Sequence, residues 1–401
     1  MPSPRPHPDS QQRALRLDAG ALDAADVAAW SELADRAVEP NPFFRPEFVL
    51  ASVAKRRAPV ELLVVRDDDR WLACMPFRRT GSWRRIPLPC LHPWLPEYSY
   101  LATLLIDRDA VRAAAEAFVA EARAQRDAAM FVFDMCDPEG PVADALVAAA
   151  RRLGVPLIVQ REFERAAWRR LPDGSEREDS MNEHKRQRLL AKQSRQLARH
   201  LDTELEVLDR AGDPAAWETF LAMENSGWKG EQGTALAAKP TDAAFFRAMC
   251  AGMSGRGGLE LRSLEGGGRS VAMECCLKEG DELIYGFKIA YDAEFSKFSP
   301  GAQLQALTLQ RFDDVRPLLY DSCAWSENAV HNRIWPDRRR MQVLVLPTVA
   351  PVARLLPFWL WIEATARGAR DGIRRRRRAA TAATLLAATD ESLSWVPNAP
   401  V

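Results

Sequence analysis

The sequence predicts a mixed α/β (α+β) fold in which a mostly antiparallel sheet is flanked by helices. Short apolar segments bounded by turn residues, such as Glu61–Arg66 and Arg70–Arg78, indicate strands. Alanine-rich segments, such as Val111–Gln125 and Pro141–Leu153, alternate with them and favour helices. A chain of 401 residues, 47% of them hydrophobic, can bury two cores, so two domains are expected.

The first half is expected to begin with a disordered lead over residues 1–14, because MPSPRPHPDSQQ is polar and rich in proline. An N-terminal domain over 15–165 follows, with helices and strands alternating around a mixed sheet. Further elements expected there are helices over Leu22–Ala37 and from Pro46, and strands over Ser82–Pro87, Ala129–Met135 and 155–160.

Met181–His200 is the most basic segment of the chain. Six Lys or Arg and no acid stand between Lys185 and Arg199, and only a narrow apolar stripe, which includes Leu197, interrupts them. Two interpretations stay open. The cations form a solvated helix face, or they bind a polyanion such as anionic lipid, tRNA or the 3′-phosphate of CoA.

The second half, residues 175–348, is expected to open with this helix and to form a second domain. Asp213 is predicted to cap a helix over Pro214–Ser226, whose proline stands in the first turn. Glycine-containing turns favour an antiparallel meander among the next strands. The strands expected here are Leu259–Leu264, Ser270–Leu277, Leu283–Tyr291, Leu318–Cys323 and Met341–Leu346.

A strand, a short break and a helix follow one another over Leu283–Leu304. Ser299-Pro300-Gly301 interrupts the chain, and the segment opened by Ala302 is rich in helix formers. The first N–H groups of a helix have no intrahelical partner, and the positive end of the helix dipole lies there. Gly301 lets an anion approach the backbone closely. The segment is a candidate phosphate site, although many junctions of this kind bind nothing.

FKIAYDAEFSKFSPGAQL, residues 287–304, resembles the acyl-CoA pyrophosphate region of GNAT N-acyltransferases. The similarity is to the CelD-like (cellulose biosynthesis protein) branch, which is related to FemAB-type transferases. ENSGWKGEQGTAL, GGRSVAMECCL and DSCAWSENAVHNRIWPDRR also match, in the family's order, between Asp213 and Pro347. The resemblance implies tandem GNAT-like domains. It also implies an acyl-CoA co-substrate, expected to be acetyl-CoA, in the second domain alone, because the first has no SPG-type loop.

The resemblance also implies which residues meet the co-substrate. The anchor for the CoA pyrophosphate is expected to be Ser299, Pro300, Gly301 and Ala302. Polarisation of the thioester carbonyl is expected from backbone N–H groups at the end of the preceding strand, near Ile289, Ala290 and Tyr291.

Three residues are candidates for acid–base catalysis. The family motif places Glu224 on the acceptor side, although it can also be an exposed carboxylate at a helix end. Asp321 and His331 belong to the DSC…H segment, and histidine titrates near neutrality unless its surroundings shift it. A lone histidine is as often structural. Cys323 is a weaker candidate, for an acyl-cysteine, because GNAT-type transfer is usually direct.

The acceptor substrate is expected to meet the side chains of Trp228, Lys229, Lys288, Trp94 and Tyr98. The two lysines can bind a phosphate or a carboxylate. Trp94 and Tyr98 belong, with His92 and Glu97, to a proline-rich loop that lies near the interdomain cleft in the family. Ordinary loop packing is the alternative for all four loop residues.

Metal chemistry is not expected, because the five histidines are isolated and no HExxH motif occurs. The seven cysteines contain no CxxC pair, and the chain does not begin with a signal peptide. A reduced, cytoplasmic protein is therefore expected. Lys plus Arg and Asp plus Glu are equal at 55 each, which argues against a global field for nucleic acid.

Near the C-terminus, VLVLPTVAPVARLLPFWLWI is apolar, but its prolines and Arg354 argue against a spanning helix. We expect an amphipathic basic helix over 349–378, ending in Arg374–Arg378, and a disordered tail over 379–401. A Trp/Phe/Leu face followed by five arginines suits peripheral contact with an anionic membrane. A helix packed on its own domain is the alternative.

Together these features predict an acyl-CoA-dependent GNAT-type N-acyltransferase. Its acceptor would be an amine on a small molecule or on a polysaccharide or envelope precursor, as in exopolysaccharide biosynthesis. A FemAB-like transferase that uses aminoacyl-tRNA is the first alternative, and only there is a nucleic acid expected. The second is a non-catalytic accessory protein of a membrane synthase.

Overall fold

The structure is a computed structural model that describes residues 13–54, 59–84, 86–171, 181–311, 318–362 and 365. The chain divides into two compact units between Thr348 and Val349. Residues 1–12 of the expected lead over 1–14, the basic run 374–378 and the expected tail over 379–401 lie outside the described residues.

Thirteen strands are found in the described part of the first unit. They are β1 Arg13–Asp18, β2 Glu61–Asp67, β3 Arg70–Thr80, β4 Cys90–Pro93, β5 Leu105–Ile106, β6 Met130–Cys136, β7 Ile158–Arg169, β8 Leu205–Asp209, β9 Leu259–Gly266, β10 Arg269–Glu279, β11 Leu283–Tyr291, β12 Leu319–Asp321 and β13 Asp337–Pro347.

The α-helices of this unit are α1 Ala24–Arg36, α2 Pro46–Val53, α3 Val111–Ala124, α4 Pro141–Arg152, α5 Met181–Leu201, α6 Pro214–Ser226, α7 Trp228–Glu231, α8 Pro240–Gly255, α9 Pro300–Arg311 and α10 Ala329–Ile334. Short 3-10 turns occur at η1 Pro42–Phe44, η2 Leu236–Ala238 and η3 Ala293–Phe298. In the second unit, residues 350–362 are helical.

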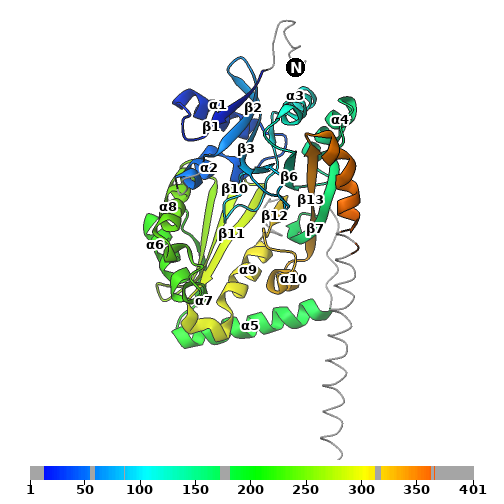
Figure 1. Ribbon diagram of the computed structural model, residues 1–401. Helices are drawn as coiled ribbons and strands as arrows, with labels where there is room; N and C mark the ends of the chain where they lie inside the picture. Colours follow the sequence, from blue (N-terminus) through cyan, green and yellow to red (C-terminus); the bar gives the residue numbers. More distant parts are fainter. Residues whose placement is uncertain are drawn as a thin grey trace, which may run out of the picture. The chain divides into compact units, whose positions relative to one another are not determined.

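All the strands belong to one sheet with the order β1-β2-β3-β4-β6-β13-β7-β12-β11-β10-β9-β8, and β5 pairs with β3 (Figure 1). The pairs β4–β6 and β11–β12 are parallel and the others are antiparallel. Helices flank the sheet, as the ribbon shows. The predicted fold class, a mixed and mostly antiparallel sheet flanked by helices, is confirmed.

Local sequence signals account for most of the elements. Asp213 caps α6, because its side chain accepts a hydrogen bond from Ala215 N at 3.0 Å. Two expectations differ from the structure. Ser82–Pro87 forms only an isolated bridge between Trp83 and Ile86. Arg13 and Ala14, expected in the disordered lead, begin strand β1, because they pair with Arg66 and Val65 of β2.

β13 joins the two halves of the chain. It lies between β6 and β7, with Leu344 opposite Phe133 and Met341 opposite Phe163. β7 in turn pairs with β12. The sheet therefore continues across the predicted boundary at 165–175, and the strand that closes the first half comes from the end of the second.

An aromatic core also links the halves. Phe43 and Phe48 come from the NPFF segment and the helix after it, and both are buried. Phe48 meets Phe245 of α8 edge-on at 5.4 Å between ring centroids, and Phe43 meets Tyr285 of β11 at 6.3 Å. The predicted aromatic plug under a helix is thus present, and it packs against the second half of the chain.

Asp321 lies at the centre of a buried ion cluster. Its carboxylate is fully buried and accepts hydrogen bonds from Arg165 of β7 and, at 2.8 Å, from Arg339 of β13. Its other oxygen accepts from Cys323 N at 2.9 Å. Burial would raise the pKa of Asp321, but the two guanidinium groups and the N–H group lower it below the ordinary value. One carboxylate thus ties three strands together.

Asp321→Ala should lower the free energy of unfolding by about 3–5 kcal/mol, because it removes the carboxylate that two buried arginines share. The control is Glu218→Ala, which breaks the exposed pair with Arg247 and should cost less than about 1 kcal/mol. Because the folded-state pKa of Asp321 is depressed, the difference from wild type should be full at neutral pH and shrink as acid protonates the carboxylate. Urea unfolding measures both. If both variants lose the same free energy of unfolding, the ion cluster stabilises the sheet no more than an exposed ion pair does.

Candidate functional site

The candidate site begins where β11 and β12 part. β12 pairs only with Leu283–Tyr285 of β11, so residues 286–291 have no neighbouring strand on that side among the described residues. Gly286 lies at the branch point, where an added Cβ would come within 2.7 Å of Ser322 O. A parallel pair that opens in this way leaves backbone hydrogen-bonding groups of β11 facing a gap.

A β-bulge in β11 determines to which face of the sheet the side chains beside this gap point. The pairing of β10 with β11 shifts between Cys275, which faces Lys288, and Cys276, which faces Gly286, so Phe287 is an extra residue. Successive strand residues normally point to opposite faces. Because of the bulge, Phe287 and Lys288 both point toward α6 and α8, where Phe287 stacks on Phe246 at 6.3 Å. The sequence carries no signal for this bulge.

The predicted CoA anchor lies against the end of β11. Ser299 has a left-handed backbone, with φ 54° and ψ 52°, and α9 begins at Pro300. Gly301 is buried against β11, so that an added Cβ would lie 3.4 Å from Ile289 Cδ1 and 3.6 Å from the Tyr291 ring. Helix geometry leaves the N–H groups of Gly301 and Ala302 without intrahelical partners.

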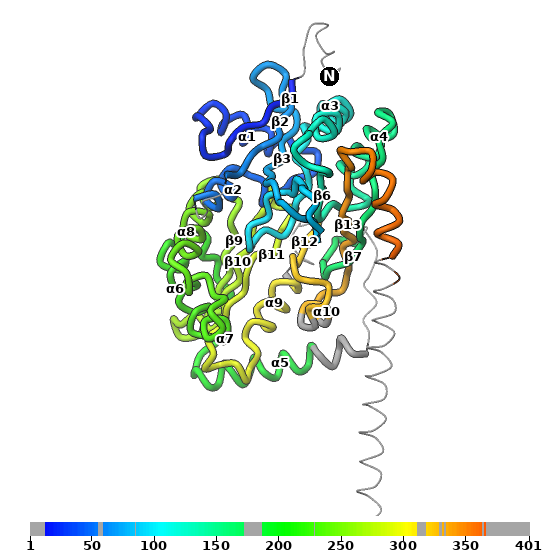
Figure 2. The backbone as a smooth tube through the Cα atoms, in the orientation of Figure 1, coloured from blue at the N-terminus to red at the C-terminus, as the bar shows by residue number. Residues whose placement is uncertain are grey.

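Five of the seven predicted cofactor residues therefore lie together, namely Ile289, Tyr291, Ser299, Pro300 and Gly301, and Ala302 continues the helix turn. Ala290 points to the other face and packs in the α6–α8 core. Gln193 of the basic helix α5 also reaches this loop, with its Nε2 at 3.4 Å from both Ser299 Oγ and Lys297 O. Figure 2 shows α5 running along the lower edge of the unit, beneath α7 and α9.

Glu224 forms a buried triad with two lysines on the face of β11 that α6 covers. Its Oε1 accepts from Lys288 Nζ at 2.7 Å and from Lys229 Nζ at 3.2 Å, and its Oε2 accepts from Leu236 N at 2.8 Å. Lys229 Nζ also donates to Ile289 O at 2.9 Å. The triad thus contacts the backbone of β11 beside the gap.

The charges in the triad perturb one another. Burial would raise the pKa of Glu224, but Lys288 and Lys229 lower it, so the carboxylate stays ionised. Burial lowers the pKa of Lys229, Glu224 raises it, and Lys288 lowers it, with a net decrease. Glu224 is therefore no exposed carboxylate at a helix end. With three donors on its oxygens, it holds the lysines in place.

The loop residues separate into two groups. Tyr98 belongs to the site: the Nζ of Lys288 lies 4.7 Å from the centroid of its ring, and its hydroxyl donates to Asp242 Oδ2 at 2.8 Å. Trp94 is 2% exposed in the core of the first half, where its indole donates to Ser52 Oγ, so the structure does not bring it to the triad. Glu97 is exposed and lies 3.7 Å from Lys239.

Two further candidates remain, His92 and Trp228. His92 is half-buried, and burial with the nearby Arg78 lowers its pKa to about 4. Trp228 opens α7, and its side chain lies outside the described residues. Tyr100, which the sequence did not single out, has a raised pKa, because its hydroxyl is buried and lies near Cys323 and Glu224.

His331 lies on the other side of the sheet. Its Nε2 is 3.1 Å from Gln305 Nε2 of α9, which also donates to the buried Glu274 at 3.1 Å. Its ring lies 5.9 Å from Trp335, and Trp335 packs on Tyr320. Tyr320 and Asp321 are adjacent strand residues and point to opposite faces. The three predicted catalytic residues therefore do not meet at one point.

Burial lowers the pKa of His331 to about 4, so the imidazole is neutral throughout the neutral range. Its Nδ1 is buried and finds no hydrogen-bond partner among the residues that the structure describes. An inflection of activity near neutrality, which an ordinary histidine would give, is therefore not expected from His331.

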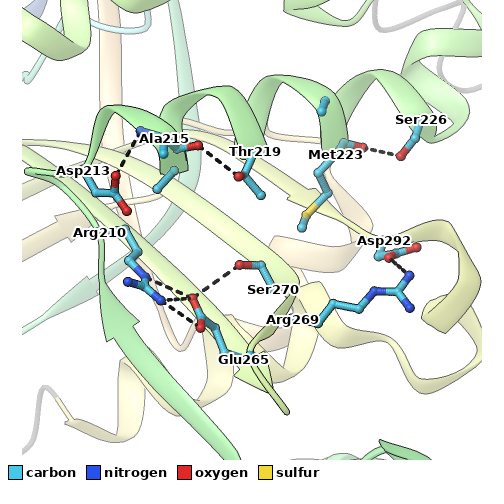
Figure 3. Close-up of a pocket in the computed structure, with 13 residues that line it drawn as sticks. Arg210, Asp213, Ala215, Thr219, Met223, Ser226, Glu265, Arg269, Ser270 and Asp292 are labelled. Carbon is cyan, nitrogen blue, oxygen red and sulfur yellow. Dashed lines mark hydrogen bonds and ion pairs between the residues drawn. The ribbon is translucent and has the colours of Figure 1, made fainter.

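A pocket of about 600 Å³ lies beside α6 (Figure 3). Its cations are paired: Arg210 forms a bidentate pair with Glu265, and Arg269 contacts Asp292 and Glu294. Its lining is Arg210, Asp213, Ala215, Ala216, Thr219, Ala222, Met223, Ser226, Glu265, Gly268, Arg269, Ser270 and Asp292. Two arginines against three carboxylates give a formal charge of −1.

The described residues contain no group of three or more His, Cys, Asp or Glu that could hold a metal ion. All seven cysteines are free and buried.

Comparison with known proteins agrees with this geometry. Residues 184–316 match the family model described as an acetyltransferase (GNAT) domain. This segment contains the bulged strand, the triad and the start of α9. The GNAT part of the predicted resemblance is confirmed, and the match supports a transferase. No curated protein matches the sequence significantly.

Two solved structures share the fold over most of the chain. One is the C-terminal domain of a protein assigned as a lysylphosphatidylglycerol synthetase from Agrobacterium fabrum, with TM-score 0.52, 12% identity, and coverage of 84% of this chain and 95% of that one. The other is FemX, with TM-score 0.52, 11% identity, and coverage of 82% of this chain and 98% of that one. At such low identity the likeness concerns the fold alone.

Glu224→Gln should lower the free energy of unfolding at pH 7 by about 3 kcal/mol, because it removes the one carboxylate between two partly buried lysines. Since the folded-state pKa of Glu224 is depressed, this loss should shrink as the pH falls below the ordinary glutamate value of about 4.3. Glu231→Gln, at an exposed position of α7, is the control and should change little. Thermal unfolding of the three proteins across this pH range decides. A loss that stays constant with pH would contradict an ionised Glu224.

Proposed function

We propose that this protein is an acyl-CoA-dependent N-acyltransferase. One observation carries the proposal: β11 opens away from β12, and the N-terminus of α9 packs on the free end of β11, inside the segment that matches the GNAT family model. This arrangement offers an anion site and a strand edge with backbone hydrogen-bonding groups a few residues apart. Transfer from a CoA thioester needs both.

The pyrophosphate would be held by the N–H groups of Gly301 and Ala302 and by the dipole of α9. Pro300 and Gly301 are buried, while Ser299 and Ala302 are half-exposed, so the phosphates would approach from their side. The thioester would lie along β11 near Ile289, where Lys229 already binds the backbone carbonyl. Acetyl-CoA is the co-substrate we expect.

The acceptor would be an amine, in line with the chemistry of an N-acyltransferase. The pocket beside α6 supports this, because its formal charge of −1 favours a cationic group over an anionic one. Polysaccharide or envelope precursors remain the proposed acceptors on the strength of the CelD-like resemblance. Of the predicted candidates for proton transfer we retain His331, whose neutral imidazole can accept a proton, since Glu224 and Asp321 each already accept three hydrogen bonds. We also retain the cytoplasm as the proposed compartment, which the seven free cysteines support.

Gly301→Val should weaken CoA binding by at least about 2 kcal/mol, roughly thirtyfold, because its bulk displaces the phosphates from the N–H groups or the helix from β11. Ser299→Ala is the matched control and should keep most of the affinity, since the proposed contacts are backbone groups. Calorimetric titration measures both, and circular dichroism verifies folding. A folded Gly301→Val protein that binds CoA as tightly as wild type would overturn the proposal. So would the absence of thiol release from every acyl-CoA, which a non-catalytic accessory protein predicts.

A transferase that uses aminoacyl-tRNA is the second candidate, and α5 is the observation that favours it. Arg188, Lys192, Arg195 and Arg199 follow one another at helical spacing and are all exposed, opposite the buried Leu197. No ion pair involves these four cations within the described part of the chain. Such a stripe suits the phosphates of a polyanion.

Salt dependence separates the two candidates. If tRNA is the donor, its affinity should fall with salt with a logarithmic slope of about −3 from this stripe alone, and changing the four cations to Gln should remove that slope. CoA binding should respond far less. Filter binding of tRNA over a range of salt concentrations makes the measurement. If tRNA binds unspecifically, with a weak salt dependence that the four substitutions do not change, the tRNA alternative is excluded.

A further inference from the structure

The helix over residues 350–362 exposes an unusual amount of apolar surface. Five large apolar side chains on it are between 38% and 62% exposed: Leu355, Phe358, Trp359, Trp361 and Ile362. They make up half of the ten exposed large hydrophobic side chains among the described residues. Exposed apolar side chains scattered singly are ordinary, but a contiguous group marks an interaction surface.

These side chains form one face. Leu355, Phe358, Trp359 and Ile362 follow the i, i+3, i+4, i+7 pattern that places residues on one side of a helix. The ring of Phe358 also stacks on Trp361 at 6.1 Å. On the other side, Leu356 and Leu360 are buried. We call the exposed set, Leu355, Phe358, Trp359, Trp361 and Ile362, the aromatic face.

The aromatic face is suited to lie on a bilayer. Trp and Phe prefer the boundary between headgroups and acyl chains. Thirteen helical residues span about 20 Å, less than the hydrocarbon core of about 30 Å. None of the helices in the described ranges is long and apolar enough to cross a membrane.

The charge of the sequence after the helix indicates which kind of surface the aromatic face binds. Further along the sequence, residues 367–378 contain seven arginines and one aspartate, although the whole chain has a formal charge of zero. Such a local excess attracts anionic lipid headgroups, and each arginine near them contributes about fivefold in affinity.

We propose that the protein docks peripherally on anionic membranes through the aromatic face, which inserts at the lipid interface, and that the arginine-rich sequence after it accounts for the preference for anionic lipid. This inference is independent of the proposed function, because it concerns a segment outside the matched GNAT domain.

The test uses the full-length protein and vesicles of equal parts phosphatidylcholine and phosphatidylglycerol, with pure phosphatidylcholine vesicles beside them. Co-sedimentation at low salt should show binding to the anionic vesicles. Phe358→Gln with Trp359→Gln should weaken it about tenfold or more. The matched control, Trp325→Gln, changes a 73% exposed tryptophan in the other unit and should bind as wild type does. Arg374–Arg378 changed to Gln should remove the preference for anionic over neutral vesicles.

Three outcomes would overturn the proposal. They are no binding of the intact protein to anionic vesicles, binding unchanged by the double Gln variant, and binding that does not distinguish the two lipids. Analytical ultracentrifugation of the same variants tests the alternative that a second copy of the chain binds the aromatic face. An oligomer that the double Gln variant dissociates would identify this face as a contact between copies.

Discussion

The ion cluster around the carboxylate of Asp321 is the interaction on which the rest of this structure depends. Asp321 lies in the last position of β12, where the strand stops pairing with β11, and it receives guanidinium groups from β7 and β13. The cluster thereby fixes β12 to β7 and β13 at the residue where the opening starts. A gap between two strands persists only when something holds them apart, because unpaired backbone groups favour closing the ladder. The buried ion cluster supplies this constraint for β12, through Arg165 of the first half of the chain and Arg339 of the second.

The sequence was sufficient for features that depend on neighbours in the chain. The cap at Asp213, the strand Leu283–Tyr291 and the helix that begins at the SPG segment each follow from a few adjacent residues, and the structure contains all three. It was not sufficient for features set by register. The extra residue at Phe287 turns Lys288 toward Glu224, yet no single residue type announces a bulge.

The same limit explains the mixed fate of the site residues. The sequence indicates Glu224, Lys229 and Lys288 as separate candidates, and long-range packing brings them together. Trp94 and Tyr98 stand four residues apart in one loop, and a sequence cannot tell which of two aromatic rings turns inward to the first core. Gln193 and Tyr100 gave no signal at all, because a glutamine on a basic helix and a tyrosine in a loop are common residues whose role comes only from what they face.

The position of β13 has a consequence for folding during synthesis. β6 and β7 are synthesised well before β13, the strand that lies between them and pairs with both. Until then each presents a row of unpaired N–H and C=O groups, which is the kind of edge that recruits foreign strands. Contacts between residues so distant in the chain also form slowly. The nascent chain should therefore spend its elongation time with an open seam, and it would gain from chaperone cover until Pro347 has emerged.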